Sequence, residues 1–561
     1  MARRGARAAL RLGVAVACMA WASAPYPAWA QEGTELSADA YALPATDPPS
    51  VPPAANSETA ATLEDNLSRD TPEYFRRIYQ SFMAAPLPKR IYDQGGIPRF
   101  VPQLEIDRDP AGKVGSYQPM GPTETATNAF FLSLGTNGRS CVTCHQPPSG
   151  MSVSVQNIRK RFRTTGGKDP IFAPVDGANC PNLVPAEDTS GSLYGGRKGR
   201  GRDFRAAHSL LLNKGLIRIP LPVPPGAEYT IKVVSDPTTC NLDPAYSLTP
   251  DGKTRVVSVF RRPILSANLN FKTSTISFGP PSPITNIMFD GREPTLFTQA
   301  VSATLGHAQA VDRPTQEQLD QIVDFETHIF SAQLRDNRAG RLDAAGATGG
   351  PINLSVHGND SPSFPPPPAF DEYAAWADAP AERRQSIFRG QQLFHGVGGE
   401  SGDRGTFLIS SVAGFNDAIG VPALPGACST CHNFSHGGSD VFAASQRDIA
   451  IGGQGSPIGG PSPATDLPIF ELTCPAGSFL WDPTLTKAYT NDPGKALITG
   501  RCRDIGAKTI PTIRALSAHA PYFSDGSAAS VLDVVEHYDE RFEMGLTYQE
   551  KVDLVNFLNA L

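Results

Sequence analysis

The chain lacks two features that would assign it to large functional classes. After residue 30, no stretch reaches the roughly 18 uninterrupted apolar residues of a membrane-spanning helix, so we expect no membrane span. An excess of positive charge is also missing: 49 Lys and Arg stand against 55 Asp and Glu, and without the four arginines of residues 1–30 the net charge is −10. This balance disfavours binding to nucleic acid or to an anionic membrane surface.

The first 30 residues predict a secretory signal peptide. Four arginines precede the short apolar run 12–21, and Ala28-Trp29-Ala30 has the small residues of a cleavage site. Residues 31–65 are rich in Pro, Ala, Thr and Ser without periodicity, and predict a disordered leader. We therefore expect an exported protein, located in the periplasm.

Cysteine is scarce, with nine residues in 561, but its placement is the most informative pattern in the chain. The motif Cys-x-x-Cys-His occurs twice, at 141–145 and 428–432. Its two thiols can each form a thioether with a haem vinyl group, and the adjacent histidine can donate a ring nitrogen to the iron. Half a zinc site or a redox dithiol would explain a single copy. Two copies behind an export signal favour two covalently bound haem c groups. The attachment residues are Cys141, Cys144, Cys428 and Cys431, and the proximal iron ligands are His145 and His432.

Four cysteines remain outside the motifs and the signal peptide. An even number in an oxidising compartment predicts disulfides, and pairing within each half of the chain gives Cys180–Cys240 and Cys474–Cys502. Free buried thiols are the alternative.

The two halves of the chain repeat one order of features. Each contains a haem motif, then an Asp-Gly turn, then a closing helix that begins with a capping box. The turns and boxes are Asp290-Gly291 and Asp525-Gly526, and Thr315 with Gln318 and Thr547 with Glu550. This duplication predicts a mainly α protein of two tandem cytochrome c-like helical domains, at 66–338 and 371–561. Residues 339–370 are rich in Gly and Pro and predict a linker.

Residues 165 to about 285 are unusually long for a cytochrome c segment. They contain strand-like runs at 229–234 and 255–260, rich in β-branched residues. We interpret this region as a β-containing insertion in the first domain.

The cytochrome portions of the chain resemble the di-haem cytochrome c peroxidase and MauG family. The resemblance covers roughly residues 120–160 and 285–561. Besides the two haem motifs it rests on Phe289-Asp290-Gly291-Arg292 running on to Gln299-Ala300, on Arg389-Gly390-Gln391-Gln392-Leu393-Phe394, and on Pro511-Thr512-Ile513-Arg514 through Ala520-Pro521-Tyr522-Phe523-Ser524-Asp525-Gly526-Ser527.

The resemblance implies that the two haems have different roles. The His432 haem would receive electrons from a small donor protein, of the cytochrome c or cupredoxin type, and the His145 haem would meet hydrogen peroxide. It also implies calcium between the domains, bound by backbone oxygens near Thr509 and Pro511, and leaves a homodimer open.

The reactive haem's surroundings depart from the family pattern at two positions. Phe289 stands where the family usually has a tryptophan between the haems, and phenylalanine is far harder to oxidise. Gln309 stands ten residues beyond Gln299, where a distal glutamate is expected, and an amide cannot move a proton between the peroxide oxygens. His307 can, but it could instead bind iron or be a structural or surface residue.

The sixth ligand of the second haem is the third departure. Counting from Gly526 leads to Tyr538, where many peroxidases place methionine, and His537 and Met544 are close by. A tyrosine ligand, as in MauG-like proteins, would lower the haem potential, and methionine would raise it. An aromatic packing role is the alternative for Tyr538.

These features together predict a periplasmic di-haem cytochrome c peroxidase. Two alternatives stay open. One is an oxidase or oxygenase of the MauG or di-haem rubber-oxygenase kind, and the other is a di-haem electron carrier whose two irons are both six-coordinate.

Overall fold

The computed structural model describes nine stretches of the chain. They are 91–184, 200–273, 287–356, 371–397, 405–410, 423–432, 446–447, 464–479 and 484–561. All belong to one compact unit, Leu87–Leu561. The predicted signal peptide and leader lie outside the described residues, as does part of the predicted linker.

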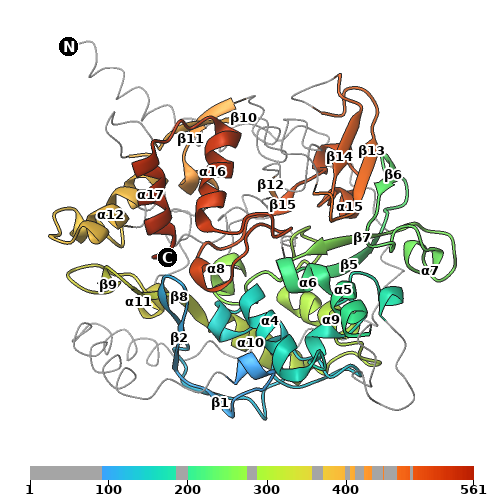
Figure 1. Ribbon diagram of the computed structural model, residues 1–561, viewed down its shortest axis with the longest axis horizontal. Helices are drawn as coiled ribbons and strands as arrows, with labels where there is room; N and C mark the ends of the chain where they lie inside the picture. Colours follow the sequence, from blue (N-terminus) through green and yellow to red (C-terminus); the bar gives the residue numbers. More distant parts are fainter. Residues whose placement is uncertain are drawn as a thin grey trace, which may run out of the picture. The chain divides into compact units, whose positions relative to one another are not determined.

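The prediction of a mainly α protein built from two tandem cytochrome c-like helical domains is wrong. The structure is 34% helical and 18% strand. The described strands form antiparallel sheets of two to four strands, interleaved with short helices (Figure 1). The helix caps were visible in the sequence, whereas strands that pair over long distances leave only weak local patterns.

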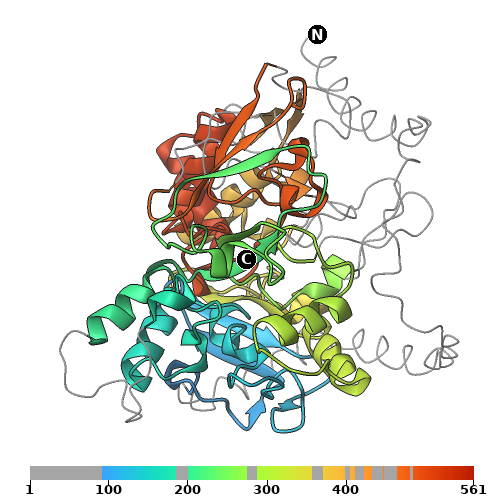
Figure 2. The same ribbon diagram turned by 90° about the vertical axis from the view of Figure 1, so that its right-hand side faces the viewer.

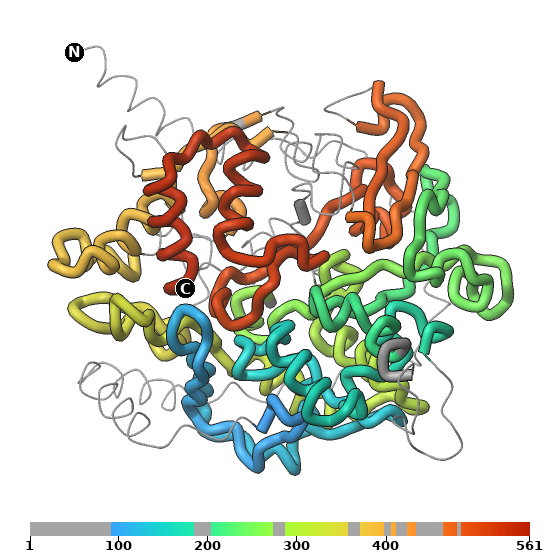
Figure 3. The backbone as a smooth tube through the Cα atoms, in the orientation of Figure 1, coloured from blue at the N-terminus to red at the C-terminus, as the bar shows by residue number. Residues whose placement is uncertain are grey.

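One four-stranded sheet lies in the first half, in the order β2-β3-β8-β9. Its strands are β2 (Leu104–Arg108), β3 (Gly112–Tyr117), β8 (Phe330–Asp336) and β9 (Gly340–Arg341), and α11 (Pro351–Val356) packs against β3 and β8. The C-terminus lies beside this sheet (Figure 3), and the backbone N–H of Gln333 in β8 donates to the carbonyl oxygen of Leu561 at 2.8 Å. Both β9 and α11 fall within residues 339–370.

Three helices of the first half surround the first haem motif. They are α4 (Val155–Thr165), α9 (Leu296–Gly306) and α10 (Gln316–Thr327). Each begins at a Ser or Thr whose hydroxyl accepts a backbone N–H, and the predicted capping box of Thr315 with Gln318 is confirmed. The core between α9 and α10 includes Phe130, Ile322 and Phe325, all buried, whereas α4 packs with Ile158 and Phe162 into a second core.

In the second half, α12 (Glu382–Phe394) packs against α17 (Tyr548–Leu558), with α16 (Val531–Phe542) beside α17. A side chain at Gly390 would collide with the backbone of Asp553, so glycine permits the close approach of the two helices. The predicted capping box of Thr547 with Glu550 is confirmed.

The predicted insertion joins the two halves. Its strand runs are confirmed, one residue later than predicted, as β6 (Thr230–Ser235) and β7 (Val256–Arg261). β7 pairs with β5 (Ile217–Pro222), but β6 pairs with β13 (Ile469–Thr473), which in turn pairs with β14 (Lys487–Thr490). Figure 2 shows this green segment beside the orange segments of the second half. A shared core of buried apolar residues, including Val257, Val259, Phe470 and Leu472, lies beneath.

The other elements are short. The helices are α5 (Arg200–Ala207), α6 (Ser209–Lys214), α7 (Pro244–Ser247), α8 (Leu269–Thr273), α14 (Cys428–Cys431) and α15 (Ala496–Thr499). The strand pairs are β1 (Phe100–Val101) with β4 (Thr123–Glu124), β10 (Phe407–Ser410) with β11 (Ala423–Gly426), and β12 (Gln446–Arg447) with β15 (Lys508–Thr509). The 3-10 helices are η3 (Tyr92–Gln94), η4 (Cys141–Thr143), η5 (Pro147–Ser149), η6 (Pro170–Phe172), η7 (Pro181–Leu183), η8 (Ala374–Trp376), η9 (Cys502–Asp504) and η10 (Leu516–Ala518).

A buried guanidinium group connects three distant segments. Arg261, at the end of β7, donates to Asp492 at 2.7 and 2.9 Å and to Asp290 at 2.5 Å. Burial alone would raise the pKa of both carboxyl groups, but the charge of Arg261 outweighs it and the pKa of each is lowered. Since all three side chains are buried, each charge depends on the others for its stabilisation.

The first prediction concerns this cluster. Arg261→Met should lower the free energy of unfolding by about 3–5 kcal/mol, because it removes the cation that the two buried carboxylates share and leaves Asp290 with Arg292 alone and Asp492 with the more distant Lys508. Urea denaturation measures the change. The pair of the half-exposed Lys487 with Glu471 provides the control: Lys487→Met should have only a small effect. Equal effects of the two substitutions would contradict the structural role of Arg261.

Candidate functional site

The first haem motif forms a tight turn at the wall of a cavity. Cys141–Thr143 make the 3-10 helix η4, and the backbone N–H of His145 donates to the carbonyl oxygen of Cys141 at 3.0 Å. Both motif cysteines are free thiols. Burial raises the pKa of each, that of Cys144 to about 11, so both are protonated near neutral pH. The turn thus presents two reduced sulfur atoms and one imidazole on the same short segment.

His145 has the hydrogen bonding expected of a metal ligand. Its Nδ1 lies 3.1 Å from the carbonyl oxygen of Met151, to which it can donate a proton. That bond leaves Nε2 with its lone pair available. Burial lowers the pKa of His145 to about 4, so the ring is neutral at physiological pH. A neutral imidazole with an oriented free nitrogen is the form that binds iron.

The cavity in front of this motif opens to solvent at its mouth. Its wall is made largely of apolar side chains from 129–134, 217–219, 263–269, 287–289 and α9. Cys141, Cys144 and His145 all line it. Two thiols and one free imidazole nitrogen at an apolar cavity fit a covalently bound haem.

His307, at the end of α9 and distant from the motif in the sequence, also lines the cavity. Its Nδ1 lies 2.5 Å from Oδ2 of Asp176, whose other oxygen pairs with Arg139. Burial by itself raises the pKa of Asp176, but Arg139 and His307 outweigh it and the pKa is lowered. Asp176 is therefore ionised and holds His307 in the tautomer with a proton on Nδ1. The Nε2 atom of His307 is left to accept or give a proton.

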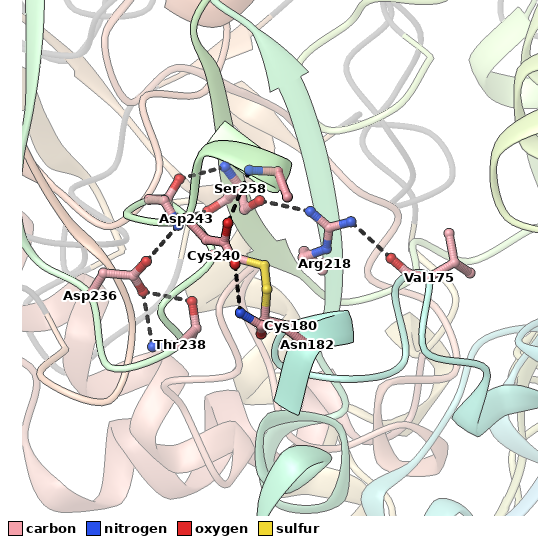
Figure 4. The surroundings of a disulfide bond; sticks show 11 residues. Val175, Cys180, Asn182, Arg218, Asp236, Thr238, Cys240, Asp243 and Ser258 are labelled. Carbon is pink, nitrogen blue, oxygen red and sulfur yellow. Dashed lines mark hydrogen bonds between the residues drawn. A yellow bond between two sulfur atoms is a disulfide. The ribbon is translucent and has the colours of Figure 1, made fainter. Parts of the chain in front are cut away.

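Asp176 belongs to the predicted insertion and is held there by several bonds. The backbone N–H of Arg218 donates to the Asp176 carbonyl oxygen at 2.8 Å, and the Arg218 guanidinium donates to Val175 and Ser258. A few residues further on, the disulfide Cys180–Cys240 ties the segment to the turn between β6 and α7 (Figure 4). Both predicted disulfides, this one and Cys474–Cys502, are confirmed.

The structure separates the predicted distal residues. His307 and Gln299 line the cavity together with Phe289. Gln309 does not: it is exposed, and its side-chain oxygen accepts a bond from Asn137 Nδ2 at 3.1 Å. The sequence patterns did not indicate Asp176, because an Asp-Gly pair near a cysteine is too common to predict a site. Only the fold brings it to His307, 131 residues away.

The second motif lies on α14, with the His432 ring 6.4 Å from that of Phe394. Burial lowers the pKa of His432 to about 4, so this imidazole is also neutral. Burial is the largest cause that raises the pKa of Tyr538 on α16, and the motif cysteines Cys431 and Cys428 add to it. Met544 packs in the same apolar cluster as Tyr538, and His537 lies against Phe523 with ring centroids 4.9 Å apart. The three candidates for the sixth ligand thus lie in one region around the end of α16.

The resemblance also implies a calcium ion. Within the described residues, no group of three or more His, Cys, Asp or Glu side chains could hold a metal ion. Carbonyl ligands for calcium near Thr509 stay a prediction; here the Thr509 N–H donates to Phe289 and its hydroxyl to Met288. Every helix in the described stretches is too short or too polar to cross a membrane.

The second prediction follows from the lowered pKa of Asp176. A carboxyl group whose folded pKa lies below its unfolded value of about 3.9 stabilises the protein above that pH, and this contribution is lost as the pH falls further. Asp176→Asn should therefore be destabilising by about 3–5 kcal/mol near neutral pH, and by progressively less below about pH 4. Urea titrations of both proteins across this range measure the difference, and a difference independent of pH would show that Asp176 is not charged.

Comparisons with known proteins give no family for the chain: no family model matches it, and no curated protein matches it.

Proposed function

We propose that this protein is a periplasmic di-haem c-type cytochrome that reduces hydrogen peroxide with electrons from a small donor protein. The observation that carries the proposal is the composition of one cavity. It contains the two thiols and the free imidazole nitrogen of Cys141, Cys144 and His145, and also a second histidine, His307, oriented by a buried carboxylate. The resemblance to di-haem peroxidases supports the same assignment.

The reaction sets the requirements for the residues of this cavity. Reduction of hydrogen peroxide to two molecules of water breaks the O–O bond and consumes two electrons and two protons. A haem held by Cys141, Cys144 and His145 would supply the redox-active iron. The protein must then take a proton from one peroxide oxygen and deliver a proton to the other.

His307 is suited to this proton transfer. With its Nδ1 proton donated to Asp176, its Nε2 can accept a proton, and the adjacent carboxylate stabilises the positive ring that results. Arg139 in turn keeps Asp176 ionised and fixes its orientation. Gln299, on the same helix as His307, can donate or accept hydrogen bonds but cannot transfer a proton.

The second motif would hold the other haem, through Cys428 and Cys431 with His432 as proximal ligand. Such a group would supply an entry point for electrons from a cytochrome c or cupredoxin. Tyr538 is our first candidate for its sixth ligand, because the resemblance leads to this position and both motif cysteines contribute to the raised pKa of its phenol.

One observation favours a second candidate function. The insertion contributes Ile217, Ile219 and the segment 261–272 to the cavity wall, so its apolar side chains could bind an organic molecule. The protein would then be an oxidase or oxygenase of the MauG or rubber-oxygenase kind. Turnover of peroxide with a reduced cytochrome, compared with oxygen uptake with organic substrates, separates the two. A peroxidase rate no better than that of free haem would eliminate our proposal.

The third prediction concerns the cofactor. Protein made in a haem-maturing host should show a Soret band and a mass increment of two porphyrins, because each motif offers two thiols for thioether bonds. The double substitution Cys141→Ser with Cys144→Ser should remove one increment, and Cys428→Ser with Cys431→Ser the other. An unchanged mass in either variant would contradict covalent attachment at that motif.

The fourth prediction concerns proton transfer. His307→Gln should lower kcat/KM for hydrogen peroxide by about 10²- to 10⁴-fold, the usual contribution of a general acid–base group. Asp176→Asn should lower it by a smaller factor, because His307 stays present without its fixed tautomer. Steady-state assays with a reduced cytochrome c measure both.

A matched control for these assays is His328→Gln. This histidine is about half exposed and pairs with Asp324 of α10, away from the cavity. It should leave the rate unchanged. If His307→Gln retained the rate of the parent protein, His307 would have no role in proton transfer.

A further inference from the structure

Among the described residues, two buried basic side chains of the cavity wall have no acidic partner. Lys272 on α8 is 6% exposed and Arg262, directly after β7, is 5% exposed, and both line the cavity. The other arginines of the wall, in contrast, form ion pairs with carboxylates. These pairs are Arg139 with Asp176, Arg261 with Asp290 and Asp492, and Arg292 with Asp290.

Lys272 has no counter-ion among the described residues. None of the ion pairs found in those stretches includes it, and residues 274–286, which follow in the chain, contain no Asp or Glu. Burial lowers the pKa of Lys272 to about 7, and no charged neighbour opposes this effect. The side chain is therefore about half protonated at neutral pH, and an anionic group beside it would favour its charged ammonium form.

In the described part of the chain, Arg262 has hydrogen-bond partners but no acidic partner. Its guanidinium donates to the carbonyl oxygens of Lys214 and Val153 at 2.7 Å and to that of His519 at 2.6 Å. These acceptors are neutral, and burial lowers the pKa of Arg262 to about 10. The three bonds fix the group at the wall without neutralising it.

Acidic residues of the wall do not offset these charges. Asp176 is already paired with Arg139 and His307. Glu326 also lines the cavity, but burial raises its pKa to about 8, so it is protonated at neutral pH. An isolated charge out of water is strongly unfavourable unless an opposite charge accompanies it. The cavity wall thus favours a ligand that carries anionic groups.

We propose that Lys272 and Arg262 bind carboxylate groups of the molecule that occupies this cavity. An ammonium and a guanidinium group both form short, charge-assisted hydrogen bonds with carboxylates. If the proposed function is correct, the two propionates of the haem are the nearest source. The other source of the same chemistry is a diffusible substrate that carries a carboxylate.

The experiment uses the purified holoprotein and three variants: Lys272→Met, Lys272→Arg, and Lys253→Met as control. Lys253 is exposed and lies in the same inserted region, so its substitution removes the same charge outside the cavity. Two quantities are measured on each protein. One is the reduction potential of both haems by spectroelectrochemical titration, and the other is the Kd for benzoate, a probe carboxylate, by calorimetry.

Each source of the carboxylate has its own result. Haem propionates predict that Lys272→Met shifts one haem to a lower potential, because removal of a nearby cation favours the ferric state, and that benzoate does not bind. A carboxylate substrate predicts that benzoate binds the parent protein and binds Lys272→Met at least about tenfold more weakly, a loss of about 1.4 kcal/mol. Lys272→Arg should behave as the parent in both cases, and so should Lys253→Met.

An unchanged potential together with undetectable benzoate binding in the parent protein would overturn the proposal. Neither measurement involves peroxide turnover, so a failed peroxidase assay would leave this result intact. If the protein carried no porphyrin, the calorimetric titration alone would decide, with benzoate binding that depends on Lys272 as the supporting outcome.

Discussion

The buried ion cluster around Arg261 is the interaction on which the arrangement of this protein depends. A guanidinium group withdrawn from water must have anionic partners, and here the partners come from two other segments, at Asp290 and Asp492. The requirement for charge balance therefore brings β7, the Asp-Gly turn before α9 and the second half of the chain to one point. Arg261 also lines the cavity, so the same constraint shapes the candidate site.

Local patterns in the sequence were sufficient for features that depend on few residues. Capping boxes at Thr315 and Thr547, the two disulfides and the strand runs that became β6 and β7 are all present. The fold class was predicted wrongly because it depends on which strands pair. β6 could have paired with its neighbours β5 and β7, and nothing in residues 230–235 indicates β13 as its partner. Such pairings are decided by the packing of a common core, here with Phe470 and Leu472.

The candidate site shows the same division. Residues of the haem motif could be found by their type and spacing, and His307 through the family resemblance, and the structure brings them to one cavity. The groups that determine what those residues can do were not visible. Asp176 orients His307 from a segment that had no assigned role, and Lys272 and Arg262 take their character from burial rather than from any motif. Electrostatic properties of this kind belong to the folded chain and not to a short stretch of it.

The pairing of β6 with β13 has a consequence for how the molecule is made. A ribosome produces residue 230 long before residue 470. Strand β6 of the inserted region therefore cannot pair with β13 until most of the polypeptide has been synthesised. Contacts this distant in sequence slow the search for the native state. The first half of the chain cannot complete its core on its own, and the protein matures as a whole only after synthesis of its last third.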